Sequence, residues 1–328
     1  MRWPAWSLTL AAVASLAAGT GAAQAEHGVF VRLADAPGSD YAAMTQAMPA
    51  LVQRAGWQLL AQYDAGTGGC RYKARVYVVH APDYAREVLR NGAHATFALP
   101  LRLAVYEDEA GAHLSLANPQ SLARTIVAET GFEAPPAEVV AALRKAIAGG
   151  FPGTPVMKEY GQVRTAGLIG KTMGIVAGGP FPSKIETIAT AKPGQSVGDA
   201  AAAVMAVAAK PTGRWQLRSV YRLDLPEQDA VVLGLAGDRM EAKAFEIVGE
   251  ASDPARKGYV CPGIDHAAAF PVELVVLREA GVVKVKLVDE MFRMKMYFED
   301  AGTMKFASNM QMPGSIEDEI RDLVEEAF

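Results

Sequence analysis

Methionine is the residue type whose distribution points most directly to chemistry in this sequence. The chain of 328 residues has 13 methionines, and six of them fall close together between positions 291 and 312: Met291, Met294, Met296, Met304, Met310 and Met312. Thioether sulfur is a soft ligand that suits Cu(I), and in an oxidising compartment thiolates tend to be lost to disulfides. The cluster therefore makes Met294, Met296, Met310 and Met312 candidate copper ligands. Packing is the favoured interpretation, because methionine also fills irregular cores and ligand grooves.

A cysteine and a histidine precede this cluster at a spacing that also occurs in metal sites. Four residues separate Cys261 from His266. This spacing, on a loop that leads into a strand, is seen in electron-transfer copper sites, which also need a second histidine and an axial ligand. Phe270 stands where an axial methionine would be plausible. We include Cys261 and His266 among the candidate metal ligands, and the alternative is a loop turn that buries an unligated thiol.

The other titratable residues show no spacing typical of a catalytic or metal site. Glu107 and Asp108 are adjacent acids at an expected hairpin turn, where solvated carboxylates are common. Three further histidines are interpreted as isolated surface or capping residues: His80, His94 and His113. The sequence therefore predicts no catalytic residues.

The two cysteines of the chain fall in different halves of the sequence. A disulfide between Cys70 and Cys261 would join the two halves in an oxidising compartment. Sequence alone does not say whether their Cα atoms come within bonding range. Two separately buried thiols are therefore the alternative.

The N-terminal segment 1–25 has the layout of a secretory signal. Arg2 supplies a positive start, residues 8–18 form a short apolar run, and Ala23-Gln24-Ala25 presents small residues at a cleavage site. We expect cleavage after Ala25 and a periplasmic or secreted product, and an N-terminal membrane anchor is the alternative. The rest of the chain has no apolar stretch that predicts a membrane span. Its net charge of −4 and pI near 5.8 disfavour a nucleic-acid partner.

The elements that would position these residues occur twice. Residues 266–287 read HAAAFPVELVVLREAGVVKVKL, and residues 94–116 carry the similar HATFALPLRLAVYEDEAGAHLSL. Each copy predicts a strand, a turn at the shared Glu-Ala-Gly, and a second strand. The segments 57–63 and 215–221 both begin with Trp-Gln-Leu and end with tyrosine. This agreement in element order and spacing predicts two related domains.

Each half reads as a strand, a helix, several strands and a final helix. The pattern predicts an α+β protein in which each antiparallel sheet packs one face against helices. The expected domains are residues 26–150 and 184–328. A Gly/Pro-rich apolar linker, 151–183, is expected to pack on a domain. The last helix is expected from Ser315, as its capping residue, to Phe328.

Several short motifs resemble those of a known family. In the first half they are 75–82, the Ala-Leu-Pro at 98–100 and the Leu-Ala-Asn-Pro at 116–119; in the second half the likeness is fainter, at 271–276. These segments resemble the family called domain of unknown function 302. The resemblance implies two tandem copies, the second divergent, each with a helix-grip arrangement similar to half of a TATA-box-binding protein. In such a domain one curved antiparallel sheet holds a helix.

The function expected from these features is binding without catalysis. Concave sheet surfaces lined by methionine and aromatic residues would hold a small apolar molecule, a periplasmic partner protein, or each other. A homo-oligomer is compatible with this expectation. The alternative is copper or redox handling through the cluster at 291–312, together with Cys261 and His266.

Overall fold

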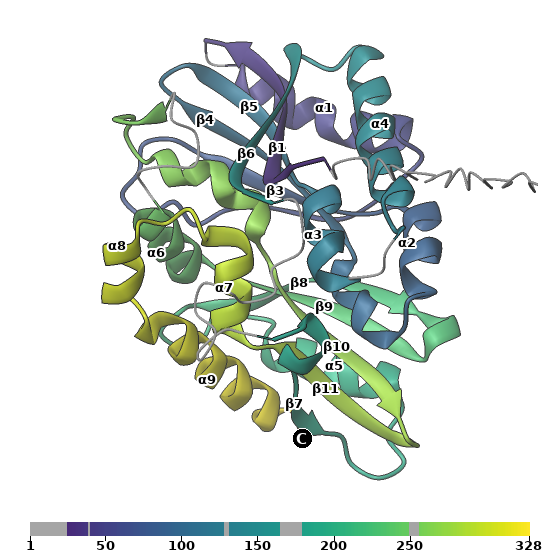
Figure 1. Ribbon diagram of the computed structural model, residues 1–328. Helices are drawn as coiled ribbons and strands as arrows, with labels where there is room; N and C mark the ends of the chain where they lie inside the picture. Colours follow the sequence, from purple (N-terminus) through teal and green to yellow (C-terminus); the bar gives the residue numbers. More distant parts are fainter. Residues whose placement is uncertain (1–24, 39, 128–130, 165–178, 249–255) are drawn as a thin grey trace, which may run out of the picture.

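The computed structural model describes residues 25–38, 40–127, 131–164, 179–248 and 256–328. Within this part, the strands form two antiparallel sheets and helices pack against them, so the protein is α+β as predicted (Figure 1). Residues 1–24 of the predicted signal peptide and residues 165–178 of the predicted linker lie outside the described residues.

The first sheet contains six strands in the order β2-β3-β4-β5-β1-β6. The strands are β1 (His27–Pro37), β2 (Gln58–Asp64), β3 (Ala74–His80), β4 (Leu101–Asp108), β5 (Gly111–Ala117) and β6 (Thr154–Arg164). The helices are α1 (Tyr41–Arg54), α2 (Pro82–Leu89), the short helical turn η1 (Ala93–Ala98), α3 (Pro119–Ile126) and α4 (Ala134–Ala148). Residues 154–164 are thus an edge strand paired with β1 and not part of a linker.

The second sheet contains five strands in the order β7-β11-β10-β9-β8. The strands are β7 (Ile185–Thr190), β8 (Leu217–Leu225), β9 (Ala230–Gly237), β10 (Val272–Glu279) and β11 (Val282–Val288). The helices are α5 (Val197–Val207), α6 (Asp238–Val248), the helical turn η5 (Pro262–Ala269), α7 (Glu290–Phe298), α8 (Thr303–Ser308) and α9 (Gln311–Glu326). Ser315 lies inside α9 and its Oγ donates to the carbonyl oxygen of Met312, so the predicted capping role of Ser315 is wrong.

The two sheets share one topology. Reading the second sheet from β8 gives the strand order of the first from β2, and only β6 lacks a counterpart among the described strands. Both hairpins follow a proline, Pro100 or Pro271, and both lead into a helix whose N-cap side chain accepts a backbone hydrogen bond. These caps are Asn118 and Asp289. The predicted internal repeat is therefore a repeat of strand order and of helix capping.

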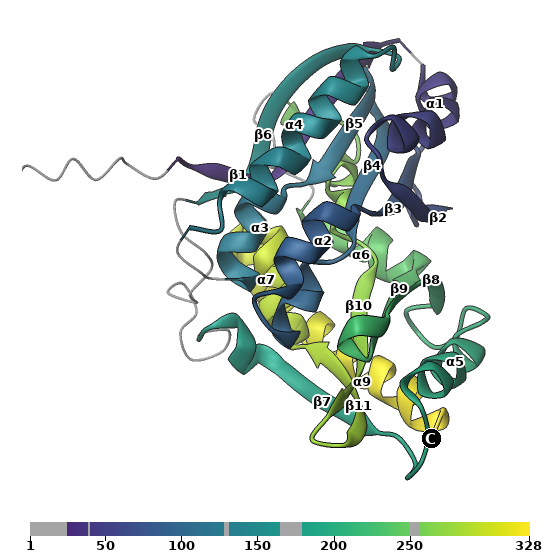
Figure 2. The same cartoon turned by 90° about the vertical axis from the view of Figure 1, so that its right-hand side faces the viewer.

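The two domains pack directly against each other. The turn η5 of the second domain contacts β3, β4 and β5, and every residue of β5 is buried. In Figure 2 the first domain lies above the second, with α2, α3 and α7 at the boundary. The central strands of the first sheet therefore lie against η5 of the second domain. Among the described residues, no helix has the length and apolar character required to cross a membrane.

Candidate functional site

A disulfide joins the two domains. Cys70, in the loop after β2, is bonded to Cys261, and their Cα atoms are 6.1 Å apart. The structure thus has the disulfide that the sequence allows and not two separate thiols. In this oxidised state Cys261 offers no thiolate to a metal ion.

His266 is fully buried between two carboxylates. Its Nδ1 lies 2.7 Å from Asp265 Oδ1, and its Nε2 lies 3.1 Å from Asp300 Oδ2. Burial lowers the pKa of His266, but Asp300 and Asp265 outweigh this effect and raise the pKa to about 10. A protonated imidazole has no lone pair for a metal ion. In the part of the chain that the structure describes, no three histidine, cysteine or acidic residues are grouped as a metal site.

A continuous chain of ion pairs runs from Asp265 into the first domain. Asp265 Oδ2 lies 2.5 Å from Arg256 Nη1, and Arg256 Nε lies 2.7 Å from Asp108 Oδ2. Asp108 Oδ1 is 2.9 Å from His113 Nε2, and His113 Nδ1 is 2.6 Å from Asp35 Oδ1. Basic and acidic side chains alternate along the whole chain. Each buried group therefore has a partner of the opposite kind on both sides, which offsets its loss of hydration.

Two of these residues correct the interpretation made from the sequence. His113 and Asp108 are buried side chains and not solvated surface groups. Burial raises the pKa of Asp108, but His113 and Arg256 outweigh burial and lower it to about 2. Burial lowers the pKa of His113, and its hydrogen bonds to Asp108 and Asp35 raise it above its ordinary value. Asp108 lies at the end of a strand in the first domain. Arg256 belongs to the second domain, and its positive charge compensates the burial of the Asp108 carboxylate.

A second buried group of charges crosses the same boundary. Arg102 and Glu273 form an ion pair, and each is the second residue of its strand, β4 or β10. Opposite charges thus occupy equivalent positions in the two copies. Arg293 lies 3.3 Å from the same glutamate and donates to the carbonyl oxygens of Ala269 and Pro271. This cluster could not be predicted from the sequence, because single charged residues in two strands give no sign of pairing.

The loop before Cys70 approaches α6 closely. Gly66 N donates to Glu241 Oε2 at 2.7 Å, and burial raises the pKa of the Glu241 carboxyl to about 7. A Cβ atom on Gly66 would overlap the backbone of Asp238, whereas Gly69 faces open space. The close approach of the two domains at this point therefore requires glycine at position 66.

Replacing Gly66 with alanine should weaken the junction. The added methyl group would displace the loop from α6 and lengthen the hydrogen bond to Glu241, at a cost of about 1–3 kcal/mol in the free energy of unfolding. Gly69→Ala, in the same loop, should change that free energy by less than about 0.5 kcal/mol. Urea denaturation of both variants tests this. Equal free energies of unfolding for the two variants would show that the loop does not need the close approach of Gly66 to α6.

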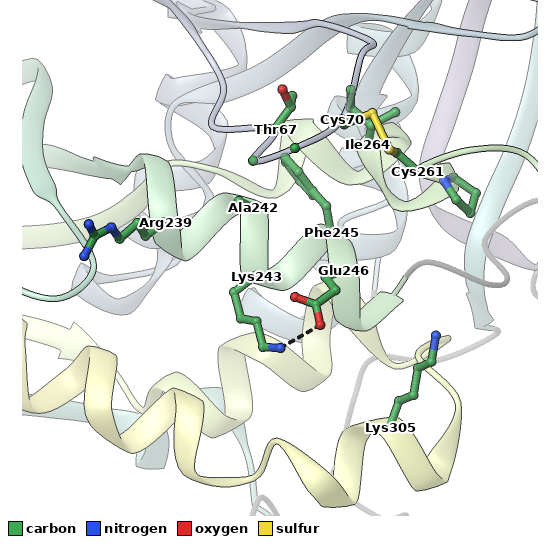
Figure 3. Close-up of a pocket in the computed structure, with 13 residues that line it drawn as sticks. Thr67, Cys70, Arg239, Ala242, Lys243, Phe245, Glu246, Cys261, Ile264 and Lys305 are labelled. Carbon is green, nitrogen blue, oxygen red and sulfur yellow. Dashed lines mark hydrogen bonds and ion pairs between the residues drawn. A yellow bond between two sulfur atoms is a disulfide. The ribbon is translucent and has the colours of Figure 1, made fainter.

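The junction also forms a groove with a volume of about 520 Å³ (Figure 3). The first domain contributes one wall, residues 67–70, and the second contributes α6, the segment around Cys261 and one residue of α8. The lining side chains include Arg239, Ala242, Lys243, Phe245, Glu246, Cys261, Ile264 and Lys305. The disulfide is part of this wall, and Figure 3 shows it above Phe245.

The lining of the groove combines positive charge with apolar surface. Three basic side chains, Arg239, Lys243 and Lys305, line the groove together with a single carboxylate, Glu246. Lys243 Nζ donates to Glu246 Oε1 at 2.8 Å. The remaining side chains are mainly apolar. A groove of this size and lining suits a small molecule with an apolar body and a negatively charged group.

The methionine cluster is only partly brought together. Met294, Met296 and Met312 are buried, whereas Met310 is 41% exposed and Met304 is 85% exposed. Met294, Met310 and Met312 line one small apolar cavity of about 20 Å³, together with phenylalanines of α7 and α8. Met296 does not line this cavity. Three of the four methionines predicted to bind copper therefore share one cavity.

Comparison with known proteins identifies the first domain. Residues 39–149, from just before α1 to just after α4, match the family model described as Domain of unknown function DUF302. No curated protein matches the chain at a significant level. A solved structure, that of an uncharacterized conserved DUF302 protein from Bacillus stearothermophilus, is similar at 18% identity and a TM-score of 0.26. The match covers 37% of this chain and 91% of that one. The match to the family model places one DUF302 domain at residues 39–149.

Proposed function

We propose that the protein is an exported, non-enzymatic binding protein that holds a small organic anion with an apolar body in the groove at the domain junction. The observation that carries the proposal is the lining of this groove, with three cations around an apolar wall. Its volume lies in the range of small-molecule sites, which are about 300–1,000 Å³. Export rests on the signal-like segment 1–25.

The second half of the chain is, on this proposal, a divergent second DUF302 copy. Its sheet has the strand order of the first, and both hairpins follow a proline and precede a capped helix. Arg102 and Glu273 occupy equivalent strand positions and pair across the junction. The walls of the groove come from both halves.

Anilinonaphthalene sulfonate is a suitable probe because it joins an aromatic body to one negative charge. We expect its fluorescence to report saturable binding to the folded chain. In the double variant Lys243→Gln, Lys305→Gln, its Kd should rise about tenfold, which corresponds to about 1.4 kcal/mol. A matched control, Lys192→Gln with Lys210→Gln, removes the same charge at exposed positions outside the groove. Equal Kd values in the two double variants would place the probe elsewhere.

A second candidate function is Cu(I) binding, favoured by the three methionines that share one cavity. If they hold Cu(I), competition with a chromophoric Cu(I) chelator should show one tight site in the wild type. Met294→Leu with Met312→Leu should weaken it at least about tenfold, since leucine keeps the volume and removes the sulfur. Met304→Leu, at an exposed position, is the control. Failure of the wild type to compete for Cu(I) would remove this candidate.

A further inference from the structure

The strand β7 has the same place in the second sheet as β1 has in the first. Residues 30–35 of β1 pair with β5, and residues 185–190 of β7 pair with β11. In each pairing one residue of the first strand has no partner residue opposite, Leu33 in β1 and Ile188 in β7, and both of these bulge residues are buried. Within the two ranges, three pairs precede the bulge and two follow it. β7 is therefore the counterpart of β1, residue by residue.

The two strands differ at their other edge. In the first sheet β6 pairs with β1 there, on both sides of the Leu33 bulge, so the bulge does not prevent pairing at that edge. In the second sheet β7 is the last strand, and none of the described strands pairs with its free edge. Figure 2 shows β7 at the margin of the second domain. The backbone of β7 thus offers hydrogen-bonding groups to an added antiparallel strand.

The sequence of β7 lacks features that commonly keep an edge strand from pairing with another copy. Such features are lysine, proline and irregular backbone. The outer strand of the first sheet, β6, has them: Pro155, Lys158, and a φ of 52° at Met157. The sequence of β7, Ile-Glu-Thr-Ile-Ala-Thr, has neither proline nor lysine and is rich in β-branched residues, which favour strands. Its single charged residue, Glu186, is paired with Arg321 of α9. This edge is therefore suited to self-association.

We propose that β7 pairs with β7 of a second copy of this chain, so that the two five-stranded sheets form one continuous sheet. Identical antiparallel strands meet across a twofold axis, which gives both copies the same contacts. The axis lies at Thr187, an exposed residue near the middle of the strand. In this register Thr187 faces itself, and threonine pairs across strands are favourable. Each Glu186 lies opposite Ile188 of the other copy, so no like charges face each other.

Light scattering coupled to size-exclusion chromatography measures the mass of the folded chain over a range of concentrations. We expect the wild type to pass from monomer to dimer as the concentration rises. Thr187→Lys would place two ammonium groups opposite each other at the axis and should raise the Kd of the dimer at least about fivefold. Thr187→Glu should do the same through two carboxylates. Thr154→Lys, at an exposed position of β6, is the matched control and should leave the Kd unchanged.

An equimolar mixture of Thr187→Lys and Thr187→Glu gives a result that misfolding cannot imitate. Opposite charges would face each other at the axis, so mixed dimers should form at concentrations where each variant alone is monomeric. A wild type that stays monomeric up to about 1 mM would overturn the inference, and so would a mixture that fails to associate. If Thr187→Lys dimerised as tightly as the wild type, the two copies would meet at another surface and the pairing of β7 would be wrong.

Discussion

Replacing Arg256 with methionine is expected to lower the free energy of unfolding by about 3–5 kcal/mol. Arg256 is buried, and its guanidinium bridges Asp108 of the first domain and Asp265 of the second in the ion-pair chain. The methionine side chain fills similar space, but both buried carboxylates lose the positive charge that Arg256 supplies. Breaking a buried pair by removing one partner costs more than the pair itself contributes. Urea denaturation followed by tryptophan fluorescence measures this loss.

Arg278 provides the matched control for this experiment. Its Nε lies 2.6 Å from Asp229 Oδ2, but both side chains are more than a third exposed. Arg278→Met should therefore cost less than about 1 kcal/mol. If Arg256→Met were no more destabilising than Arg278→Met, the buried charge chain would not hold the domains together.

The second large effect is a loss of stability at alkaline pH that depends on His266. Folding raises the pKa of His266 from its ordinary value of 6.5 to about 10, so the folded state binds the proton more tightly than the unfolded state. The stabilising contribution is complete below pH 6.5 and is lost as the pH rises towards 10. One such proton contributes a slope of about 1.4 kcal/mol per pH unit within this window.

Two substitutions distinguish this proton from other titrating groups. His266→Gln should be less stable than the wild type at pH 6.5 and should show a shallower decline between pH 7 and pH 9.5. His80→Gln should keep the wild-type slope, because burial lowers the pKa of His80 and its imidazole is already neutral in this range. If the stability of His266→Gln declined with pH as steeply as that of the wild type, His266 would not be protonated in the folded protein.

The order of strands and helices along the chain could be predicted because its signals are local. Apolar periodicity, turn residues and the repeated hairpins mark the strands independently of the rest of the chain. The alignment of the two copies was less exact. The first hairpin has strands that begin at Leu101 and Gly111, and the second has strands that begin at Val272 and Val282. When these starts are superposed, the matching Glu-Ala-Gly triplets, at 109–111 and 279–281, fall one position out of register. The motif therefore identifies the hairpin but does not align its two turns.

The charges of the junction could not be predicted because their partners are distant in sequence. Asp108 and Arg256 are 148 residues apart, and the sequence around each of them has no pattern that indicates a buried side chain. The edge strand β6 was missed for a different reason. Its segment has the glycine and proline content of a linker, and the exposed residues of the strand lack a clear alternation. Cys261 and His266 both lie at the domain junction, the first in a disulfide and the second in a chain of ion pairs.

Hydrogen exchange with and without anilinonaphthalene sulfonate tests the central claim most directly. If the junction groove holds small anions, the probe should slow exchange in residues 67–70 and 239–246, which form its two walls. The helix α2 lines two other surface pockets, and its hydrogen exchange should not change when the probe is added. Protection confined to α2, or no protection at either wall of the groove, would contradict the account.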